Sequence, residues 1–308
     1  PALLTGSITS INHVSCKGGN NGSATVSAYG GTLPYTYLWS PLAGGPTDSI
    51  ADSLYAGGYN ITITDANNCS ISLNVNINEP TQLIVNIDTV INVSCNGAND
   101  GAASIIASGG TPAYTYSWDY DSTQTSFIID DLSPGLYNVT VTDANGCNSL
   151  ASITITQPAI LIATIINSTN VSCNGADDGS ASLTTSGGTP PYSYVWSDPL
   201  AQSTASADSL APGTYIVIVT DVNGCGTTAS ASITEPTVLV ATITDSTNIS
   251  CNGACDGQAV VSASGGTPGY SYVWNTTPFQ STDTASGLCP GSYTITVIDT
   301  NGCQKTDS

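Results

Sequence analysis

The sequence has almost no positive charge. Lys17 and Lys305 are its only basic residues against 22 acidic ones, and the formal net charge is −20. A nucleic-acid binder needs clustered lysine and arginine to neutralise phosphates. Binding to an anionic membrane surface needs the same clusters. We therefore expect neither nucleic acid nor membrane among the partners of this chain.

Catalytic side chains and long apolar runs are also scarce. There is one histidine, His13, and no arginine. Most enzymes use His, Lys or Arg as a base or a charge clamp, so we expect no enzyme and no catalytic residues. The longest mainly apolar run, 159–166, is far shorter than the roughly 20 residues that span a bilayer.

What is present indicates an all-β protein. Charged residues make up only 8% of the chain and hydrophobic residues 40%, which excludes a disordered acidic chain. Val, Ile, Thr and Tyr are frequent, and 31 glycines and 16 prolines punctuate them. This composition is typical of short strands separated by turns.

The chain is a fourfold repeat. Cys16, Cys95, Cys173 and Cys251 follow one another at intervals of 79, 78 and 78 residues, and each lies 15 residues after a proline. A self-similar period of this kind is the signature of a tandem array. The predicted repeats are 1–79, 80–157, 158–235 and 236–308, the last with an incomplete final strand.

Each repeat reads as six or seven short strands. In repeat 2 the alternating and β-branched stretches are 82–91, 102–107, 114–118, 125–129, 136–142 and 149–156. A tryptophan on the third strand and a late tyrosine predict an immunoglobulin-like β-sandwich. Single prolines join the repeats without a flexible linker, which predicts a stiff rod of tandem sandwiches.

A Tyr-x-Tyr-x-Trp motif recurs in every repeat. Side chains alternate along a strand, so the three rings share one face. We expect them to pack in the core. The alternative is an exposed platform that stacks on sugars, which would make the repeats carbohydrate-binding modules. The tryptophans are Trp39, Trp118, Trp196 and Trp274.

Ten cysteines in a histidine-poor chain without Cys-x-x-Cys pairs predict disulfides rather than zinc, and a location outside the cytosol. We expect one bond within each repeat and one extra bond in repeat 4. Strand parity leaves bonds between neighbouring repeats open, because with seven strands the two cysteine loops of a repeat would lie at opposite ends. The expected pairs are Cys16–Cys69, Cys95–Cys147, Cys173–Cys225, Cys251–Cys303 and Cys255–Cys289.

Aspartates recur in the two loops that carry the cysteines. If those loops adjoin, oxygen ligands from both could hold Ca²⁺. The simpler interpretation is that Asp and Asn stabilise the turns through bonds to the backbone. No other cofactor is expected. The candidates are Asp65, Asp143, Asp221 and Asp299 in the second loop, and Asp100, Asp178 and Asp256 in the first.

Three motifs of repeat 2 resemble the SprB-type repeat of very large Bacteroidetes surface adhesins. They lie at 93–101, 109–118 and 132–147, and equivalents occur in all four repeats. The resemblance implies an exported cell-surface protein, delivered by type IX secretion. It would serve as an adhesive or filament-forming stalk, with a possible part in gliding motility. Its expected partners are neighbouring repeats, like chains or surface polysaccharide.

Two further expectations accompany this resemblance. The incomplete last strand of repeat 4 is explained either by a longer array or by a strand that another chain supplies, as in donor-strand fibres. Seven Asp-(Ser/Thr)-x triplets match the O-glycosylation motif known in the Bacteroidetes. Their hydroxyl residues are Ser49, Ser53, Thr89, Ser122, Ser209, Ser246 and Thr284.

Overall fold

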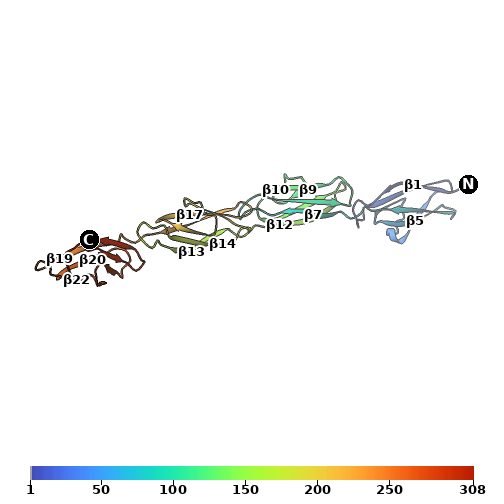
Figure 1. Ribbon diagram of the computed structural model, residues 1–308. Coiled ribbons are helices and arrows are strands. Elements are labelled where there is room, and N and C mark those ends of the chain that lie inside the picture. The colour runs from blue at the N-terminus through green and yellow to red at the C-terminus, as the bar shows by residue number, and fades with distance from the viewer. Residues whose placement is uncertain (1) are drawn as a thin grey trace. The chain divides into compact units, whose positions relative to one another are not determined.

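A computed structural model describes residues 2–308, with the backbone alone at residue 42; Pro1, the expected first residue of repeat 1, lies outside the described residues. The described chain forms eight three-stranded sheets, two for every set of six strands. The chain divides into two compact units, Pro1–Gln157 and Pro158–Ser308 (Figure 1). In the described part, no helix is long and apolar enough to cross a membrane.

The first unit contains repeats 1 and 2. Repeat 1 comprises β1 (Thr5–Asn12), β2 (Gly22–Tyr29), β3 (Thr36–Trp39), the 3-10 helix η1 (Pro41–Ala43), β4 (Ile50–Leu54), β5 (Gly57–Thr64) and β6 (Ser70–Ile77). Repeat 2 comprises β7 (Ile84–Ile91), β8 (Gly101–Ser108), β9 (Thr115–Trp118), β10 (Ile128–Leu132), β11 (Gly135–Thr142) and β12 (Asn148–Ile155).

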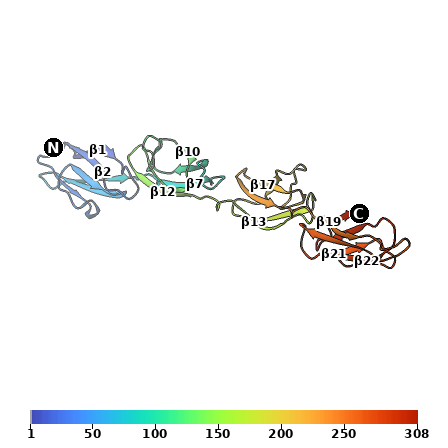
Figure 2. The same cartoon turned by 90° about the vertical axis from the view of Figure 1, so that its left-hand side faces the viewer.

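The second unit contains repeats 3 and 4. Repeat 3 comprises β13 (Ile162–Thr169), β14 (Gly179–Ser186), β15 (Ser193–Trp196), β16 (Ser206–Leu210), β17 (Gly213–Thr220) and β18 (Gly226–Ile233). Repeat 4 comprises β19 (Val240–Thr247), β20 (Gly257–Ser264), β21 (Ser271–Trp274), β22 (Thr284–Leu288), β23 (Ile295–Ile298) and β24 (Gln304–Asp307). Figure 2 shows the C-terminus beside β19.

Every repeat has the same topology. In repeat 2 one sheet has the order β10-β8-β7 and the other β12-β11-β9, and all pairs are antiparallel. The longest ladder, between β11 and β12, runs unbroken from Gly135↔Ile155 to Thr142↔Asn148. Two facing antiparallel sheets around a central tryptophan form an immunoglobulin-like sandwich, as the sequence predicts.

The chain crosses each repeat seven times but forms only six strands. In repeat 2, the loop at Gly110 turns the chain between β8 and β9, so β9 runs opposite to β8. β10 is also antiparallel to β8, so β9 and β10 run in the same direction. The segment 119–127 therefore returns the chain without forming a strand. The strand expected at 125–129 is shifted accordingly and begins only at Ile128. As a result, β7 and β12 run the same way, and the chain enters and leaves a repeat at opposite ends.

The core of each repeat surrounds its tryptophan. Trp118 is only 1% exposed, and its indole N–H donates to the carbonyl of Ser126 at 2.9 Å. Tyr137 is also buried, and its hydroxyl donates to the carbonyl of Ser133, four residues earlier. A buried ring whose polar atom has a partner carries little desolvation penalty. The equivalent tryptophans are buried to the same degree: Trp39, Trp196 and Trp274.

Burial of all four indoles makes a prediction for fluorescence. We expect acrylamide to quench the native emission much less than that of the urea-unfolded chain, because quencher reaches only exposed rings. The measurement is the ratio of Stern–Volmer constants in the two states. Equal constants would mean that the rings are accessible, as a sugar-stacking platform requires.

Candidate functional site at the junction between repeats

Two loops of each repeat carry the repeat cysteines, and they lie at opposite ends. The exit loop joins the first two strands and lies beside the end of the last strand, since Val14 N–H donates to the carbonyl of Asn78. The entry loop joins the fifth and sixth strands. It lies beside the start of the first strand, where Gly31 N–H donates to the carbonyl of Ala2 and Gly31 contacts Asp65. Within each unit, the exit loop of the first repeat therefore faces the entry loop of the second.

A buried aspartate builds the entry loop. Asp143 Oδ1 accepts the N–H groups of Asn145 and Cys147, both at 2.9 Å, and Oδ2 accepts the N–H of Thr111 at 2.8 Å. One carboxylate thus joins the Asp-x-Asn-x-Cys turn to the Gly-Gly-Thr turn. Burial raises the pKa of Asp143, but the N–H groups of Thr111, Cys147 and Asn145 outweigh it and lower the pKa below its ordinary value.

The two glycines of the Gly-Gly-Thr motif have no room for a side chain. Gly110 has a φ of 59°, and a Cβ on it would lie 2.6 Å from Asp143 Oδ2. Gly109 has a φ of 73°, and a Cβ there would meet the carbonyl oxygen of Gln82 at 2.0 Å. Both positions combine a left-handed backbone with a close approach, so only glycine fits.

The exit loop is held by side chains from both of its flanks. Asp100 Oδ1 accepts the N–H of Ser94 at 2.9 Å, and hydrogen bonds from the Ser94 hydroxyl and N–H lower the pKa of Asp100. Gln157, just before the junction proline, accepts the N–H of Gly97 at 2.8 Å. In repeat 1, Glu79 fills the latter role and adds an ion pair with Lys17.

In each unit, a disulfide joins the exit loop of the first repeat to the entry loop of the second. Cys16 is bonded to Cys147 with a Cα–Cα distance of 5.7 Å. Beside this bond, Asn145 Nδ2 donates to the carbonyl of Ser15 at 3.0 Å. The junction between repeats 3 and 4 repeats this arrangement: Cys173–Cys303 has the same Cα–Cα distance, and Asn301 Nδ2 donates to the carbonyl of Ser172 at 2.9 Å.

The pairing expected within repeats is therefore wrong. Cys147 bonds to Cys16 and Cys303 to Cys173, so Cys16–Cys69, Cys95–Cys147, Cys173–Cys225 and Cys251–Cys303 do not form. The physical reason is that the chain crosses each repeat seven times, which places the two cysteine loops of one repeat at opposite ends. The extra pair of repeat 4, Cys255–Cys289, is bonded as expected.

The other four cysteines differ in their bonding state. Cys95 and Cys225 are also disulfide-bonded. Cys69, in the entry loop of repeat 1, and Cys251, in the exit loop of repeat 4, are free and exposed, contrary to the expectation that all ten are bonded. By contrast, Cys147 and Cys303 at formed junctions are half-buried.

The aspartates proposed for calcium are separated by the same topology. The entry-loop and exit-loop aspartates of one repeat lie at opposite ends, so the expected adjoining of those loops within a repeat is wrong. Within residues 2–308, no cluster of three or more His, Cys, Asp or Glu could hold a metal ion. The carboxylates bind backbone N–H groups instead, in Asp65, Asp221 and Asp299 of the entry loops and Asp178 and Asp256 of the exit loops. Calcium binding stays a prediction.

The candidate O-glycosylation residues are distributed over all four repeats. Most of their side chains are exposed, which is the accessibility that a modifying enzyme needs. The exposed residues are Ser53, Thr89, Ser122, Ser209 and Ser246, and the half-buried ones are Ser49 and Thr284. Glycan occupancy remains a prediction.

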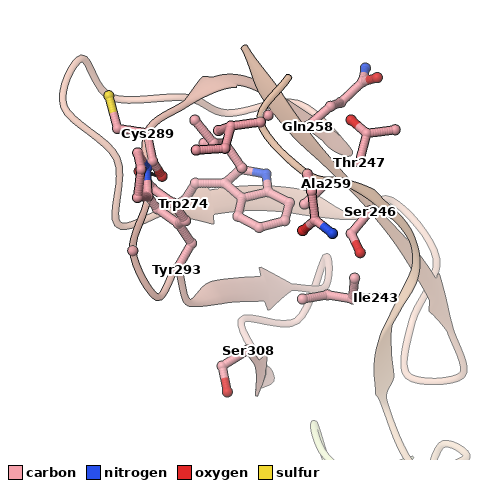
Figure 3. Close-up of a pocket in the computed structure, with 15 residues that line it drawn as sticks. Ile243, Ser246, Thr247, Gln258, Ala259, Trp274, Cys289, Tyr293 and Ser308 are labelled. Carbon is pink, nitrogen blue, oxygen red and sulfur yellow. Dashed lines mark hydrogen bonds between the residues drawn. The ribbon is translucent and has the colours of Figure 1, made fainter. Parts of the chain in front are cut away.

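Repeat 4 has a cavity of about 500 Å³ at its incomplete sixth strand (Figure 3). Trp274, Ile243 and Gly257 are among its lining residues. In repeat 2 the equivalent space is filled by Ile155, which packs so closely on Gly101 that a Cβ there would lie 2.8 Å from it. The close-up shows Ser308 below the Trp274 ring, on the side where the β24 strand ends. Sequence reasoning predicted the shortened strand but not this cavity.

The fold and the junctions define the class of the protein: tandem immunoglobulin-like sandwiches, with a disulfide between the two repeats of each unit. The SprB repeat family matches the chain four times, at residues 6–44, 87–123, 165–201 and 243–279. The chain therefore contains four tandem SprB repeats. A comparison with curated protein sequences found no match.

Three solved structures with some likeness to this chain are distant from it. The three N-terminal domains of the bacteriophage RB49 outer capsid protein Hoc have 16% identity and a TM-score of 0.40, over 76% of this chain and 99% of that one. A tetra-tandem repeat from the extending region of a large adhesion protein has 14% identity and a TM-score of 0.29, over 100% and 98%. Invasin, a bacterial integrin-binding protein, has 11% identity and a TM-score of 0.34, over 99% and 78%.

The entry-loop carboxylates predict a loss of stability in acid. The pKa of each is lowered in the folded chain, so their contribution is complete above the unfolded value of about 3.9 and is lost as pH falls through the folded pKa. We expect the urea midpoint to be flat above pH 5 and to fall steeply below pH 4.

A matched pair of variants tests whether these carboxylates cause the acid loss. Asp143→Asn replaces an acceptor oxygen by a donor facing Thr111, so it should lower the urea midpoint at pH 7 and weaken the acid dependence. Asp130→Asn, at an exposed position of the same repeat, should change neither. Equal midpoints for the two variants at pH 7 would contradict the role given to Asp143.

Proposed function

We propose that this chain is a structural, non-enzymatic segment of an extracellular bacterial surface adhesin. The observation that carries the proposal is the disulfide between consecutive repeats, seen at Cys16–Cys147 and Cys173–Cys303. Disulfides persist outside the cytosol, and SprB repeats are found in surface adhesins. In more specific terms, we propose that the chain is exported by the type IX route, serves as a stalk and takes part in gliding motility.

The placement of the bonds suits a chain that carries tension. The Cys16–Cys147 bond encloses 131 residues and Cys173–Cys303 encloses 130. When the array is pulled from its ends, each bond carries the load across its loop. The enclosed residues then cannot be drawn out even if their sheets open. In the chain-entropy account, closing a loop of this size also stabilises the folded state by about 5 kcal/mol.

Other functions find less support in the described residues. The four tryptophans are buried, so they cannot form the sugar-stacking platform that a carbohydrate-binding module would need. The hydroxyls of the recurring tyrosines are engaged within their repeats: Tyr114 donates to the carbonyl of Gly109 and Tyr137 to the carbonyl of Ser133. The buried aspartates hold turns and are not arranged as an acid–base pair.

Single-molecule pulling tests the mechanical role. With disulfides intact, we expect a short extension, because the two loops stay closed. Full reduction should add up to about 450 Å for each loop, given about 3.4 Å per extended residue. Extension of the oxidised chain to the length of the reduced chain would contradict the proposal.

Two double variants sharpen this measurement under oxidising conditions. Cys16→Ser/Cys147→Ser opens one junction and should lengthen the extension. Cys255→Ser/Cys289→Ser removes a bond that lies inside the loop closed by Cys173–Cys303, so the extension should match that of the unmodified chain.

A second candidate function is acceptance of a β-strand from another chain at the cavity of repeat 4; continuation of the array beyond residue 308 would fill the same cavity. Its lining includes Trp274 and Gly257, and in repeat 2 an isoleucine of the final strand occupies the equivalent space. An extended segment with apolar residues at alternate positions would fill it, as in β-strand addition. The chain would then be a subunit of a donor-strand surface fibre.

A peptide tests strand acceptance. We expect a peptide of residues 148–157, the final strand of repeat 2, to raise the melting temperature of repeat 4, because its isoleucines cover the exposed core. A matched peptide with aspartate in place of both Ile153 and Ile155 should have no effect. Equal shifts with both peptides, or none with either, would remove this candidate.

A further inference from the structure

Repeat 1 has a hollow on the outer face of its β3-β5-β6 sheet. The hollow has a volume of about 560 Å³. Sites that bind small molecules have volumes of about 300–1,000 Å³. Its floor is formed by the sheet residues Leu38, Asn60 and Thr62, which share the outward side because Trp39 and Ile61 point into the core. The hollow therefore lies within one repeat, away from the junctions.

The wall of the hollow is the segment that follows the tryptophan. This crossing is one residue longer in repeat 1, from Trp39 to Leu54, than in repeat 2, from Trp118 to Leu132. It begins with η1 and then turns at two consecutive glycines. A Cβ on either glycine would have no atom within 4 Å, so the space beside them is open. The wall residues are Ser40, Pro41, Gly44 and Gly45.

The other three repeats have a hydrogen bond at this place. The side chain of the first residue after the tryptophan accepts the N–H of the facing residue on the fifth strand. This bond ties the start of the crossing segment to the sheet. The acceptors and donors are Asp119 with Asn138 at 3.0 Å, Ser197 with Ile216 at 2.9 Å and Asn275 with Thr294 at 2.8 Å.

Ser40 of repeat 1 departs from this pattern. Its N–H donates to the carbonyl of Asn60 at 2.8 Å, as in the other repeats. Its hydroxyl oxygen, however, is buried without a hydrogen-bond partner among the described residues and does not cap η1. The Asn60 N–H thus does not receive the acceptor that its equivalents have. A serine side chain has three staggered positions about its Cα–Cβ bond, so this hydroxyl can turn toward the hollow.

The chemistry of the lining favours an uncharged ligand that is rich in hydroxyls. Ser40, Asn60 and Thr62 supply hydroxyl and amide groups, and Leu38 and Pro41 supply an apolar surface. Among the described residues that line the hollow, none carries a charge. The net charge of −20 repels anionic ligands. A neutral pyranose combines hydroxyl groups with an apolar C–H face, so it fits this set of groups.

The sheet surface beside the hollow continues in the same chemistry. Asn60 Nδ2 donates to Asn74 Oδ1 at 3.0 Å, and the hydroxyls of Thr62 and Ser72 lie 3.3 Å apart. These pairs join the floor of the hollow to the exposed side of β6. A saccharide longer than one unit would therefore meet further neutral amide and hydroxyl groups along the sheet.

We propose that repeat 1 binds a neutral saccharide, as one or more units of an uncharged polysaccharide, in this hollow. Hydroxyls of the sugar bond to Ser40 and to the Asn60 N–H, and its C–H face covers Leu38, which is 60% exposed. The site differs from the stacking platform considered above, because Trp39 lies beneath it and offers no open ring face. The inference adds a binding function to the structural role proposed for the chain.

Ligand-detected NMR tests this site. The whole chain is mixed in turn with cellohexaose, maltohexaose and laminarihexaose, and saturation transfer from protein to sugar is measured. Because a shallow hollow covers only part of the sugar, we expect a Kd on the order of 1 mM. At least one of these neutral sugars should receive saturation, while hexagalacturonate, which carries carboxylates, should receive none.

Three variants locate the binding. Ser40→Asn copies Asn275 of repeat 4, so it should supply the missing acceptor and close the hollow. We expect binding to weaken by about tenfold or more, while the urea midpoint stays equal or rises. Leu38→Asp places a charge on the floor and should weaken binding as much. Val195→Asp, at the equivalent exposed position of repeat 3, is the matched control and should bind like the unmodified chain.

Several outcomes would overturn the proposal. These are no transfer to any of the three neutral hexasaccharides, or unchanged binding by both Ser40→Asn and Leu38→Asp. Equal transfer to a capped hexapeptide of serine, asparagine and leucine would assign the hollow to a peptide instead. None of these results affects the pulling experiment, because that experiment depends only on the disulfides.

Discussion

The direction in which the chain crosses each sandwich determines where its cysteine loops lie and which cysteines can be bonded. Seven crossings bring the chain in at one end of a repeat and out at the other. The loop after the first strand must then lie at the exit and the loop after the fifth at the entry, where Val14 and Gly31 fix them. Cysteines in these loops cannot meet within a repeat, but they do meet across a junction. The cross-linked array follows from this one constraint.

The aspartate of the entry loop shows how few residues specify the junction. Its two oxygens receive three backbone N–H groups, which fix Asn145 and Cys147 in position to contact the preceding repeat. Gly110 is required because the carboxylate occupies the space of a side chain. Most of the repeated motifs of the sequence therefore serve either the contact between neighbouring repeats or the packing of the core tryptophan.

The sequence was sufficient to predict the repeat, the all-β sandwich and most strands, because alternation and turn residues are local signals. β10 was misplaced: the segment 119–127 crosses the repeat without forming a strand, and no local pattern distinguishes such a crossing from a strand. The disulfide partners were predicted wrongly for the same reason. The number of crossings, odd or even, decides whether the two cysteine loops of a repeat lie at the same end or at opposite ends. Cys255–Cys289 was predictable because both cysteines occur in one repeat only.

Each repeat carries one half of the junction at its entry and the complementary half at its exit, and this has a genetic consequence. Duplication or deletion of one whole repeat brings a new exit loop opposite a new entry loop, and the cysteines still match. An insertion of half a repeat would leave mismatched thiols. Recombination among such similar repeats can therefore change the length of the array while every junction that remains can still be closed.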